Sequence, residues 1–370
     1  MKEGNKVVFI TDPSHQRLDE LPDHEQFQIQ EISVPSPQRD PSEGLIGSIS
    51  EQKVRTQQIK SILSAAEGQN CDVLHLLWFD RTLVPYTIAS LHLKAYDFSV
   101  VGTLHRDSFT SSGGGVLKQA TRQVSTLSLA SVLKSKALDV LTVHADSIKK
   151  RLLAQTICIS EEDVQVIPAP TPDLSTHCTK QQARKKLNLP QDKPIILFFG
   201  GLRYEKGPDI LGKELGALNC EITVVFAGSA VDYDEDDVDE WIEGANDSVE
   251  VVSHLEFIPE SLVDYYFIAT DVLVLPYRRK RGISGPMRRA CMTGVPIIGN
   301  QDSDIGEIID RYDLGETFTR ESGQDLCQAI VSLINSEEDY QNSLENYARK
   351  QHWEEAGVAL KRLYREVAET

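Results

Sequence analysis

Short apolar runs alternate with stretches of helical spacing along the whole chain. Continuous apolar runs of about four to eight residues are typical of strands that are buried on both faces of a parallel sheet. The runs lie at 6–11, 72–77, 98–104, 140–143 and 164–167 in the first half, and at 195–199, 222–227, 249–252, 271–275 and 295–299 in the second. Residues 27–34 alternate between apolar and polar side chains and are also expected to form a strand. Helical spacing is found at 51–67, 82–93, 116–136 and 145–154, then between the later strands, and through most of 338–367. This alternation predicts an α/β fold of two Rossmann-like, doubly wound domains that face a cleft.

A proline-rich segment, PAPTPD at 168–173, separates the two halves and is the best candidate for a linker. We therefore expect an N-terminal domain at 1–170, a C-terminal domain at 171–350 and a final helix at 351–370. Ligands of such domains bind at the carboxyl ends of the strands. Residues 35–48 are rich in Pro, Ser and Gly and are expected to form a loop.

Composition narrows the class of protein. Apolar residues make up 40% of the chain and charged residues 25%, which fits a soluble globular protein. No apolar run approaches the roughly 18–20 residues of a membrane span, and the N-terminus leads into a strand without a signal-peptide core. We expect a cytoplasmic protein, with peripheral contact with the inner face of a membrane left open. The net charge of −18 argues against nucleic-acid binding.

Two other features of composition have plain structural interpretations. The acidic segment 232–241 is expected to begin a helix, with a calcium site as the less favoured alternative because the segment lacks the glycine turn of a calcium loop. The six cysteines are scattered without a CxxC motif, so we expect buried thiols and not disulfides or zinc ligands.

The segment GGLRYEKGPDIL at 200–211 predicts a strand, a glycine turn and a helix that begins at Pro208. Arg203 and Lys206 lie in the turn, and a helix start attracts anions through its exposed amides and its dipole. A diphosphate site involving Gly200 and Gly201 is one interpretation. An ordinary strand–turn–helix with two solvated cations is the other.

A second anion site is predicted within 276–299. Ser284 has the character of a helix N-cap, Gly285 and Pro286 open the helix, and Gly294 closes it. Six cations surround this helix start: Arg278, Arg279, Lys280, Arg281, Arg288 and Arg289. A basic surface loop is the alternative.

These motifs resemble the retaining, nucleotide-sugar-dependent glycosyltransferases of group 1, also called family 4, which have the GT-B fold. The resemblance is strongest at 200–211 and at 272–309, where VLVLPYR, SG, GVPII and GEII follow in order. FIPESLVDYYFIATD at 257–271 fits the segment between them, and DVLHLLWFDR and VVGTLHRD match the N-terminal half more loosely.

The resemblance implies a sugar transfer from a nucleoside-diphosphate sugar to a glycan, lipid or small-molecule acceptor, with no metal cofactor. Arg203 and Lys206 would hold the diphosphate, together with Ser284 and Gly285. The remaining site residues would be His105 near the donor sugar or acceptor, Glu256, Phe257 and Ile258 near the base, and Arg281 and Glu307 near the donor. The final helix would return to the N-terminal domain.

Two departures from the family are evident. The family usually carries two glutamates across the second loop, one at the donor sugar and one at the ribose, and those positions are Arg281 and Arg289 here. TDPSHQ at 11–16 replaces the usual glycine-rich loop. An inactive relative or nucleotide-sugar-binding protein, and a sugar-nucleotide epimerase, therefore remain as alternatives.

Four further side chains have competing interpretations. His75 is expected to be structural and Trp353 to anchor the final helix in the core. For Asp80 and Arg81 two interpretations stay open: an ion pair that supports the cleft, or contact with the acceptor.

Overall fold

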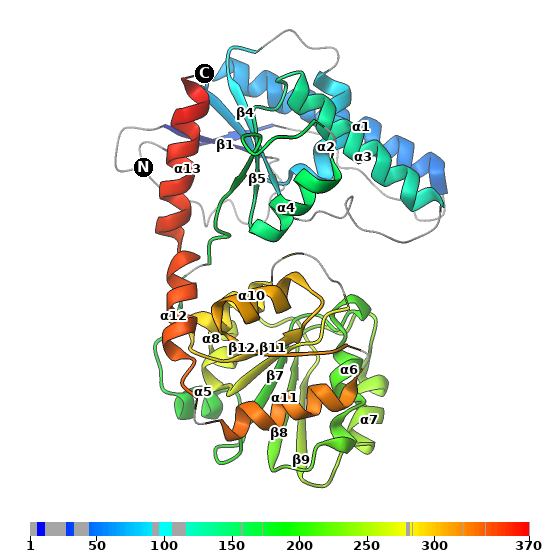
Figure 1. The fold of residues 1–370 in the computed structure, drawn as a ribbon, viewed down its shortest axis with the longest axis vertical. Coiled ribbons are helices and arrows are strands. Elements are labelled where there is room, and N and C mark those ends of the chain that lie inside the picture. Colours follow the sequence, from blue (N-terminus) through cyan, green and yellow to red (C-terminus); the bar gives the residue numbers. More distant parts are fainter. Residues whose placement is uncertain are drawn as a thin grey trace. The chain divides into compact units, whose positions relative to one another are not determined.

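The computed structural model divides into two compact units, each built around a parallel sheet (Figure 1). One unit comprises Met1–Ile167 with Leu360–Thr370, and the other comprises Pro168–Ala359. The second unit begins at the first residue of the proline-rich segment. The structure describes residues 6–11, 27–32, 44–90, 96–105, 116–156, 158–171, 173–278, 282, 284–320, 322–336 and 338–369. The predicted α/β class with parallel sheets is confirmed.

The second unit contains a six-stranded sheet in the order β12-β11-β10-β7-β8-β9. Its strands are β7 (Ile195–Phe199), β8 (Ile222–Ala227), β9 (Val249–His254), β10 (Val272–Leu275), β11 (Ile297–Asn300) and β12 (Gly315–Phe318). Every residue of β8, β10 and β11 is buried, as expected for strands covered on both faces. The strand order reverses between β10 and β7, so the loops that follow these two strands are neighbours at the carboxyl edge.

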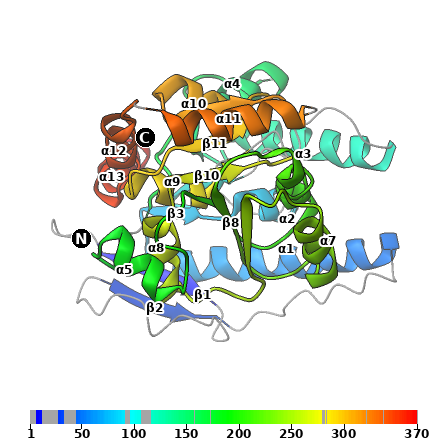
Figure 2. The same cartoon turned by 90° about the horizontal axis from the view of Figure 1, so that it is seen from below.

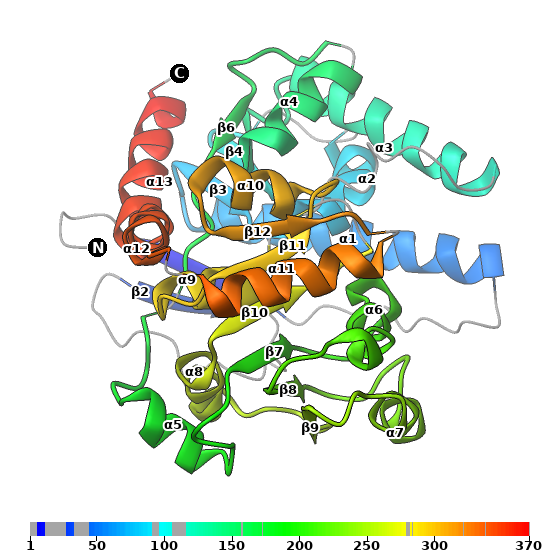
Figure 3. The same cartoon turned by 60° about the horizontal axis from the view of Figure 1, so that its bottom comes forward.

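Helices cover both faces of this sheet. They are α5 (Lys180–Lys186), α6 (Pro208–Gly212), α7 (Glu235–Glu243), α8 (Glu260–Ala269), α9 (Gly285–Met292), α10 (Asp304–Tyr312), α11 (Gly323–Asn335) and α12 (Gln341–Lys350). Helix α5 packs beside α8 (Figure 2), and α11 lies across β10, β11 and β12 (Figure 3).

The first unit contains a four-stranded parallel sheet in the order β3-β4-β5-β6 and a separate parallel pair, β1 with β2. Its strands are β1 (Val7–Thr11), β2 (Phe27–Glu31), β3 (Val73–Leu76), β4 (Ser99–Leu104), β5 (Val140–Val143) and β6 (Val164–Val166). The helices are α1 (Gly44–Gly68), α2 (Phe79–Ser90), α3 (Val116–Lys134) and α4 (Asp146–Gln155).

The last helix, α13 (Trp353–Ala368), contributes its C-terminal part to the first unit. Leu363 and Val367 are buried, and the backbone carbonyl of Val367 accepts a 2.7 Å hydrogen bond from Ser99 Oγ. Trp353 is 54% exposed and Val358 is 68% exposed, so the prediction that Trp353 is a core anchor was wrong. The buried side chains of α13 are Ala356, Leu363 and Val367, so fewer of its apolar residues are covered than the sequence suggested.

Several other boundaries differ from prediction. Helix α1 begins at Gly44, inside the segment expected to be a loop, and β2 ends at Glu31. Strand β12 was not predicted, because GETF contains a single large apolar residue. The acidic segment does begin a helix: the Asp234 side chain accepts a hydrogen bond from the Asp237 amide and caps α7.

All six cysteines are free thiols, as predicted. Cys291 is buried, and burial raises the pKa of its thiol. Cys158 is exposed, however, so the expectation of burial was wrong for that residue.

A directed chain of hydrogen bonds ties α13 to three strands of the first unit. Thr142 donates to the carbonyl of Gly102, so Thr142 Oγ1 accepts from Thr103 at 2.6 Å. Thr103 then accepts from His75 Nε2, and His75 Nδ1 accepts from the Tyr364 hydroxyl, each at 2.6 Å. This chain requires a neutral His75, and burial together with the charges of two other histidines lowers the pKa of His75 from 6.5 to about 4.

The first testable prediction concerns acid stability of this unit. The pKa of His75 in the folded protein lies below its value in the unfolded chain. The stability that neutral His75 contributes is therefore fully present above pH 6.5 and is lost as the pH falls from 6.5 to about 4. A difference of this size corresponds to about 3 kcal/mol at most. We expect urea unfolding of the wild type to lose up to that amount between pH 7 and pH 4. A His75→Gln variant should be less stable at pH 7 and should lose less over the same range. Equal pH dependence in both proteins would contradict this assignment.

Candidate active site

Two cations of the second unit lie over the glycine turn that follows β7. A Cβ placed on Gly200 would be 2.3 Å from Lys206 Nζ, and one on Gly201 would be 3.8 Å from Arg203 Nε. Arg203 is exposed and Lys206 is half-buried. Both positive charges therefore lie at the carboxyl edge of the sheet, next to backbone that carries no side chain.

The backbone at this edge leaves no room for larger residues. Gly200 has a φ of +111° and Gly228, at the end of β8, has a φ of +143°. A Cβ on Gly228 would be 2.4 Å from the carbonyl carbon and oxygen of Gly200. The ends of β7 and β8 therefore approach each other closely, and both positions require glycine.

The helix after this turn contributes less positive potential to the predicted anion site than the sequence suggested. Residues Tyr204–Lys206 form a single 3-10 turn, and α6 has only five residues after Gly207. A helix this short sums few peptide dipoles. The positive character of the turn therefore comes mainly from Arg203 and Lys206 themselves.

Arg278 fixes the neighbouring loop and does not point outward. Its guanidinium donates to both carboxylate oxygens of buried Asp209, at 2.7 and 2.6 Å, and to the carbonyl of Tyr204 at 2.9 Å. These bonds hold the pKa of Asp209 below its ordinary value despite burial. Arg278 thus joins the loop after β10 to the loop after β7.

The start of α9 lies on the loop after β10. Ser284 caps this helix, as predicted, by accepting a 3.3 Å hydrogen bond from the Met287 amide. The Ser284 hydroxyl also lies 3.3 Å from the Tyr277 hydroxyl, and Ser284 is 2% exposed. Gly285 is exposed, with no described atom within 4 Å of where its Cβ would be. The Gly285 amide is therefore better placed for a ligand than the buried Ser284 hydroxyl.

The arginines on α9 are bonded inside the protein. Arg288 donates to the carbonyls of Ala169 and Pro170 at 2.6 and 3.3 Å, and burial lowers its pKa. Arg289, which the resemblance places at the family's second glutamate position, donates to Asp264 and Glu260 of α8. With Arg278, three of the six cations assigned to this loop have structural partners, so the expectation of a cationic cluster is corrected for these three.

The remaining predicted residues of the second unit lie on two other elements. Glu256 and Phe257 are exposed in the loop after β9, with Phe257 at 79%, whereas Ile258 is buried in the core. Glu307 lies in the first turn of α10 and forms a 2.5 Å ion pair with Arg311.

His105 follows β4 at the carboxyl edge of the first unit's sheet. Its Nε2 lies 2.7 Å from the carbonyl oxygen of Leu77, and its ring stacks on exposed Trp78 with centroids 4.2 Å apart. Its Nδ1 lies 3.2 Å from His144 Nε2. Asp80 Oδ1 accepts from the His105 amide at 3.5 Å. Sequence reasoning missed Trp78 and His144, although each follows a predicted strand that neighbours β4.

Part of the predicted site lies outside the described residues. This applies to Arg279, Lys280 and Arg281, to 12–16 and to Arg106 and Asp107, as well as to the side chain of Arg81. Among the described residues no group of three or more His, Cys, Asp or Glu side chains could hold a metal ion. No described helix is long and apolar enough to cross a membrane.

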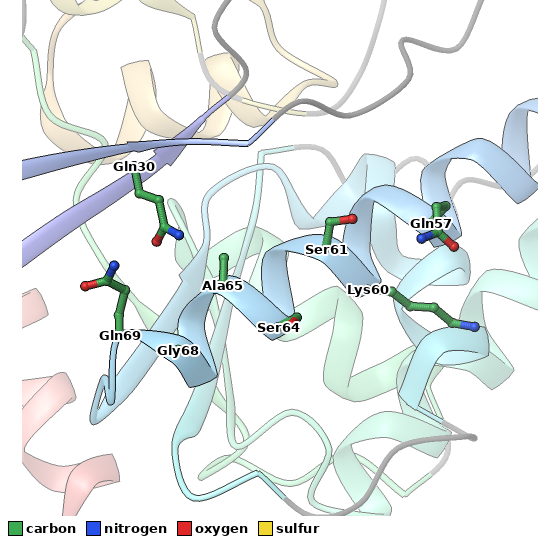
Figure 4. Close-up of a pocket in the computed structure, with 8 residues that line it drawn as sticks. All are labelled: Gln30, Gln57, Lys60, Ser61, Ser64, Ala65, Gly68 and Gln69. Carbon is green, nitrogen blue, oxygen red and sulfur yellow. The ribbon is translucent and has the colours of Figure 1, made fainter.

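A cavity of about 530 Å³ lies elsewhere in the first unit, between β2 and α1 (Figure 4). Gln30 and Gln69 extend towards the same space, and Gln57, Lys60, Ser61 and Ser64 line the rest (Figure 4). None of the predicted site residues lines this cavity.

Comparison with known proteins links this geometry to one family. Residues 179–351 match the family model described as glycosyl transferases group 1. The D-inositol 3-phosphate glycosyltransferase of Corynebacterium aurimucosum is 23% identical over 251 residues, which is 61% of this chain and 56% of that protein. The corresponding enzyme of Xylanimonas cellulosilytica is 29% identical over 131 residues, covering 35% of this chain and 31% of the relative. The chain thus spans about half the length, or less, of the curated relatives it matches.

Solved structures of other proteins have the same fold as this chain. Sucrose-phosphate synthase of Thermosynechococcus elongatus superposes with a TM-score of 0.73 at 17% identity, covering 98% of this chain and 89% of that one. HepE of Anabaena, solved with UDP, has a TM-score of 0.69 at 13% identity, covering 99% and 100%. The chain has the GT-B fold of these solved structures, and its residues 179–351 are similar to the group 1 glycosyl transferase family.

Proposed function

We propose that this chain transfers a sugar from a nucleoside-diphosphate sugar to an acceptor hydroxyl, with retention of anomeric configuration. The observation that carries the proposal is the convergence of Arg203 and Lys206 on the Gly200–Gly201 turn at the carboxyl end of β7. A diphosphate is a compact double anion, and a side-chain-free turn under two cations suits its size and charge. Solved relatives that bind UDP or UDP-glucose support the donor class.

In this proposal the two cations act when the bond between the sugar and the diphosphate breaks. Negative charge then builds on the departing phosphate oxygens, and Arg203 and Lys206 offset it, aided by the Gly285 amide at the start of α9. A charge-assisted hydrogen bond is worth roughly 1.5–3 kcal/mol. These groups would neutralise the leaving diphosphate without a metal. Exposed Phe257 after β9 would contact the base, and Glu307 would lie near the donor sugar.

A thermal-shift measurement with free nucleotides tests donor binding. UDP, GDP and ADP at about 100 times their dissociation constant would stabilise the fold by about 2.7 kcal/mol. We expect at least one of the three to raise the melting temperature of the wild type, and the same nucleotide to have little effect on an Arg203→Ala/Lys206→Ala variant. If none of the three shifts the wild type, or if the double variant responds equally, the diphosphate assignment is wrong.

The second candidate function is a nucleotide-sugar-binding protein without transferase activity. It is favoured by one specific observation: Arg289, at a position where the sequence resemblance implies a glutamate, is bound to Asp264 and Glu260. Binding of a nucleotide without sugar transfer or donor hydrolysis would favour this candidate. The anomeric coupling constant of the product, measured by NMR, would test retention.

A further inference from the structure

Two histidines at the carboxyl edge of the first unit's sheet face each other through one nitrogen each. His105 follows β4 and His144 follows β5, which are neighbouring strands. His105 Nδ1 and His144 Nε2 are 3.2 Å apart, and the ring centroids are 4.8 Å apart. Both histidines belong to the first unit, and the glycine turn with Arg203 and Lys206 belongs to the second.

The other nitrogen of each ring faces a backbone carbonyl. His105 Nε2 lies 2.7 Å from the Leu77 oxygen, and His144 Nδ1 lies 3.0 Å from the Ile167 oxygen. A carbonyl oxygen can only accept a hydrogen bond, so both of these nitrogens must carry a proton. Two neutral imidazoles hold two protons in total, and these two bonds use both.

If both rings were neutral, the two facing nitrogens would present lone pairs to each other across 3.2 Å. A third proton converts this repulsive contact into a hydrogen bond in which one nitrogen donates to the other. We infer that His105 and His144 share one proton and form a pair with a single positive charge, in which His144 is the positioning residue of His105.

The groups around the pair fit one charge and not two. The Asp80 carboxylate contacts the His105 amide, and the indole of Trp78 stacks on the His105 ring at 4.2 Å, where a cation is favourable. His75, a third histidine of the same sheet, is kept neutral by burial and by the charges of His105 and His144, which lower its pKa. A second extra proton would remove the acceptor at the shared hydrogen bond.

This assignment deepens the proposed function and rests on it for its catalytic meaning. A charged His105 with both nitrogens bonded inside the protein cannot take a proton from the acceptor hydroxyl. It acts instead as a fixed cation at the strand edge, held in plane by His144, Leu77 and Trp78. The charge favours a substrate with a negatively charged group or developing negative charge at this edge.

Imidazole ¹⁵N NMR tests the shared proton directly and needs no substrate. With ¹⁵N-histidine at pH 7, the pair should show three protonated nitrogens and one lone-pair nitrogen. In a His144→Asn variant the neutral amide can still donate to His105 Nδ1, so His105 should keep its Nε2 proton and become neutral. His144→Phe should also give a neutral His105, without the fixed ring orientation. His254, bonded to Tyr266 in the second unit, serves as an internal reference that should not change.

Turnover provides the second measurement. In His144→Asn, kcat should be about tenfold lower at neutral pH, with KM little changed. Two lone-pair nitrogens in the wild-type pair at pH 7, or unchanged His105 spectra in both variants, would overturn the inference. A three-proton signature without transfer from any donor would instead refute the proposed function and support the proton assignment.

Discussion

Replacing Arg203 and Lys206 together with alanine is expected to lower kcat for sugar transfer by about 100-fold or more, and each single change by at least tenfold. Each tenfold corresponds to about 1.4 kcal/mol of lost transition-state stabilisation. Both side chains lie over Gly200 and Gly201, so each removal leaves the leaving diphosphate with one positive charge fewer. Because that charge is greatest in the transition state, kcat should fall more than KM rises. Steady-state kinetics with the donor identified by thermal shift would measure this.

The same strand offers a matched control at its other end. Lys193 precedes β7 and pairs with Glu221 and Glu250 at 3.4 and 3.6 Å. Lys193→Ala removes one cation from the same unit, so it should leave kcat within about twofold if position and not net charge matters. A folded double variant with wild-type turnover would refute the proposed role of the two cations. An equal loss in Lys193→Ala would show that the effect is one of overall charge.

The framework of this fold could be predicted from hydrophobic pattern because most strands are buried on both faces. The runs around β7, β8 and β10 are continuous and apolar, and the structure has strands there within one or two residues. Strand β12 was not predicted because Phe318 is its single large apolar residue. The strand forms by pairing with β11, which its own sequence does not indicate. Helix α1 begins at Gly44, inside the segment whose Gly and Ser residues led us to predict a loop.

The position of the candidate site could be predicted from the sequence, but the directions and partners of its side chains could be predicted only in part. Glycine turns and helix caps are encoded locally, so Gly200 lies in the predicted turn and Ser284 caps its helix as predicted. The direction of a long side chain depends on distant partners. Nothing near Arg289 in the sequence shows that α8 presents two carboxylates to it, and nothing near His105 shows that His144 follows the neighbouring strand.

Introducing the family's glutamate at position 289 is expected to destabilise the second unit strongly. Arg289 is the cation for Asp264, whose side chain is 1% exposed, and for Glu260. The other oxygen of Asp264 accepts from the amide and hydroxyl of Ser175 at 2.6 and 2.7 Å. Arg289→Glu would leave Asp264 buried without its cation and add a third carboxylate beside it. Breaking a buried pair in this way costs about 3–5 kcal/mol. Urea unfolding followed by fluorescence and circular dichroism would measure the loss.

Two further variants keep this prediction decisive even if Arg289→Glu does not fold. Arg289→Gln with Asp264→Asn replaces the ion pair with neutral groups that can still hydrogen-bond to each other and to Ser175, so this double variant should regain most of the stability. Arg311→Glu makes the same change in the exposed pair with Glu307, and it should cost about 1 kcal/mol or less. If Arg289→Glu is as stable as Arg311→Glu and binds the nucleotide more tightly, Arg289 faces the ligand and does not support α8. That outcome would make position 289 part of the proposed donor site.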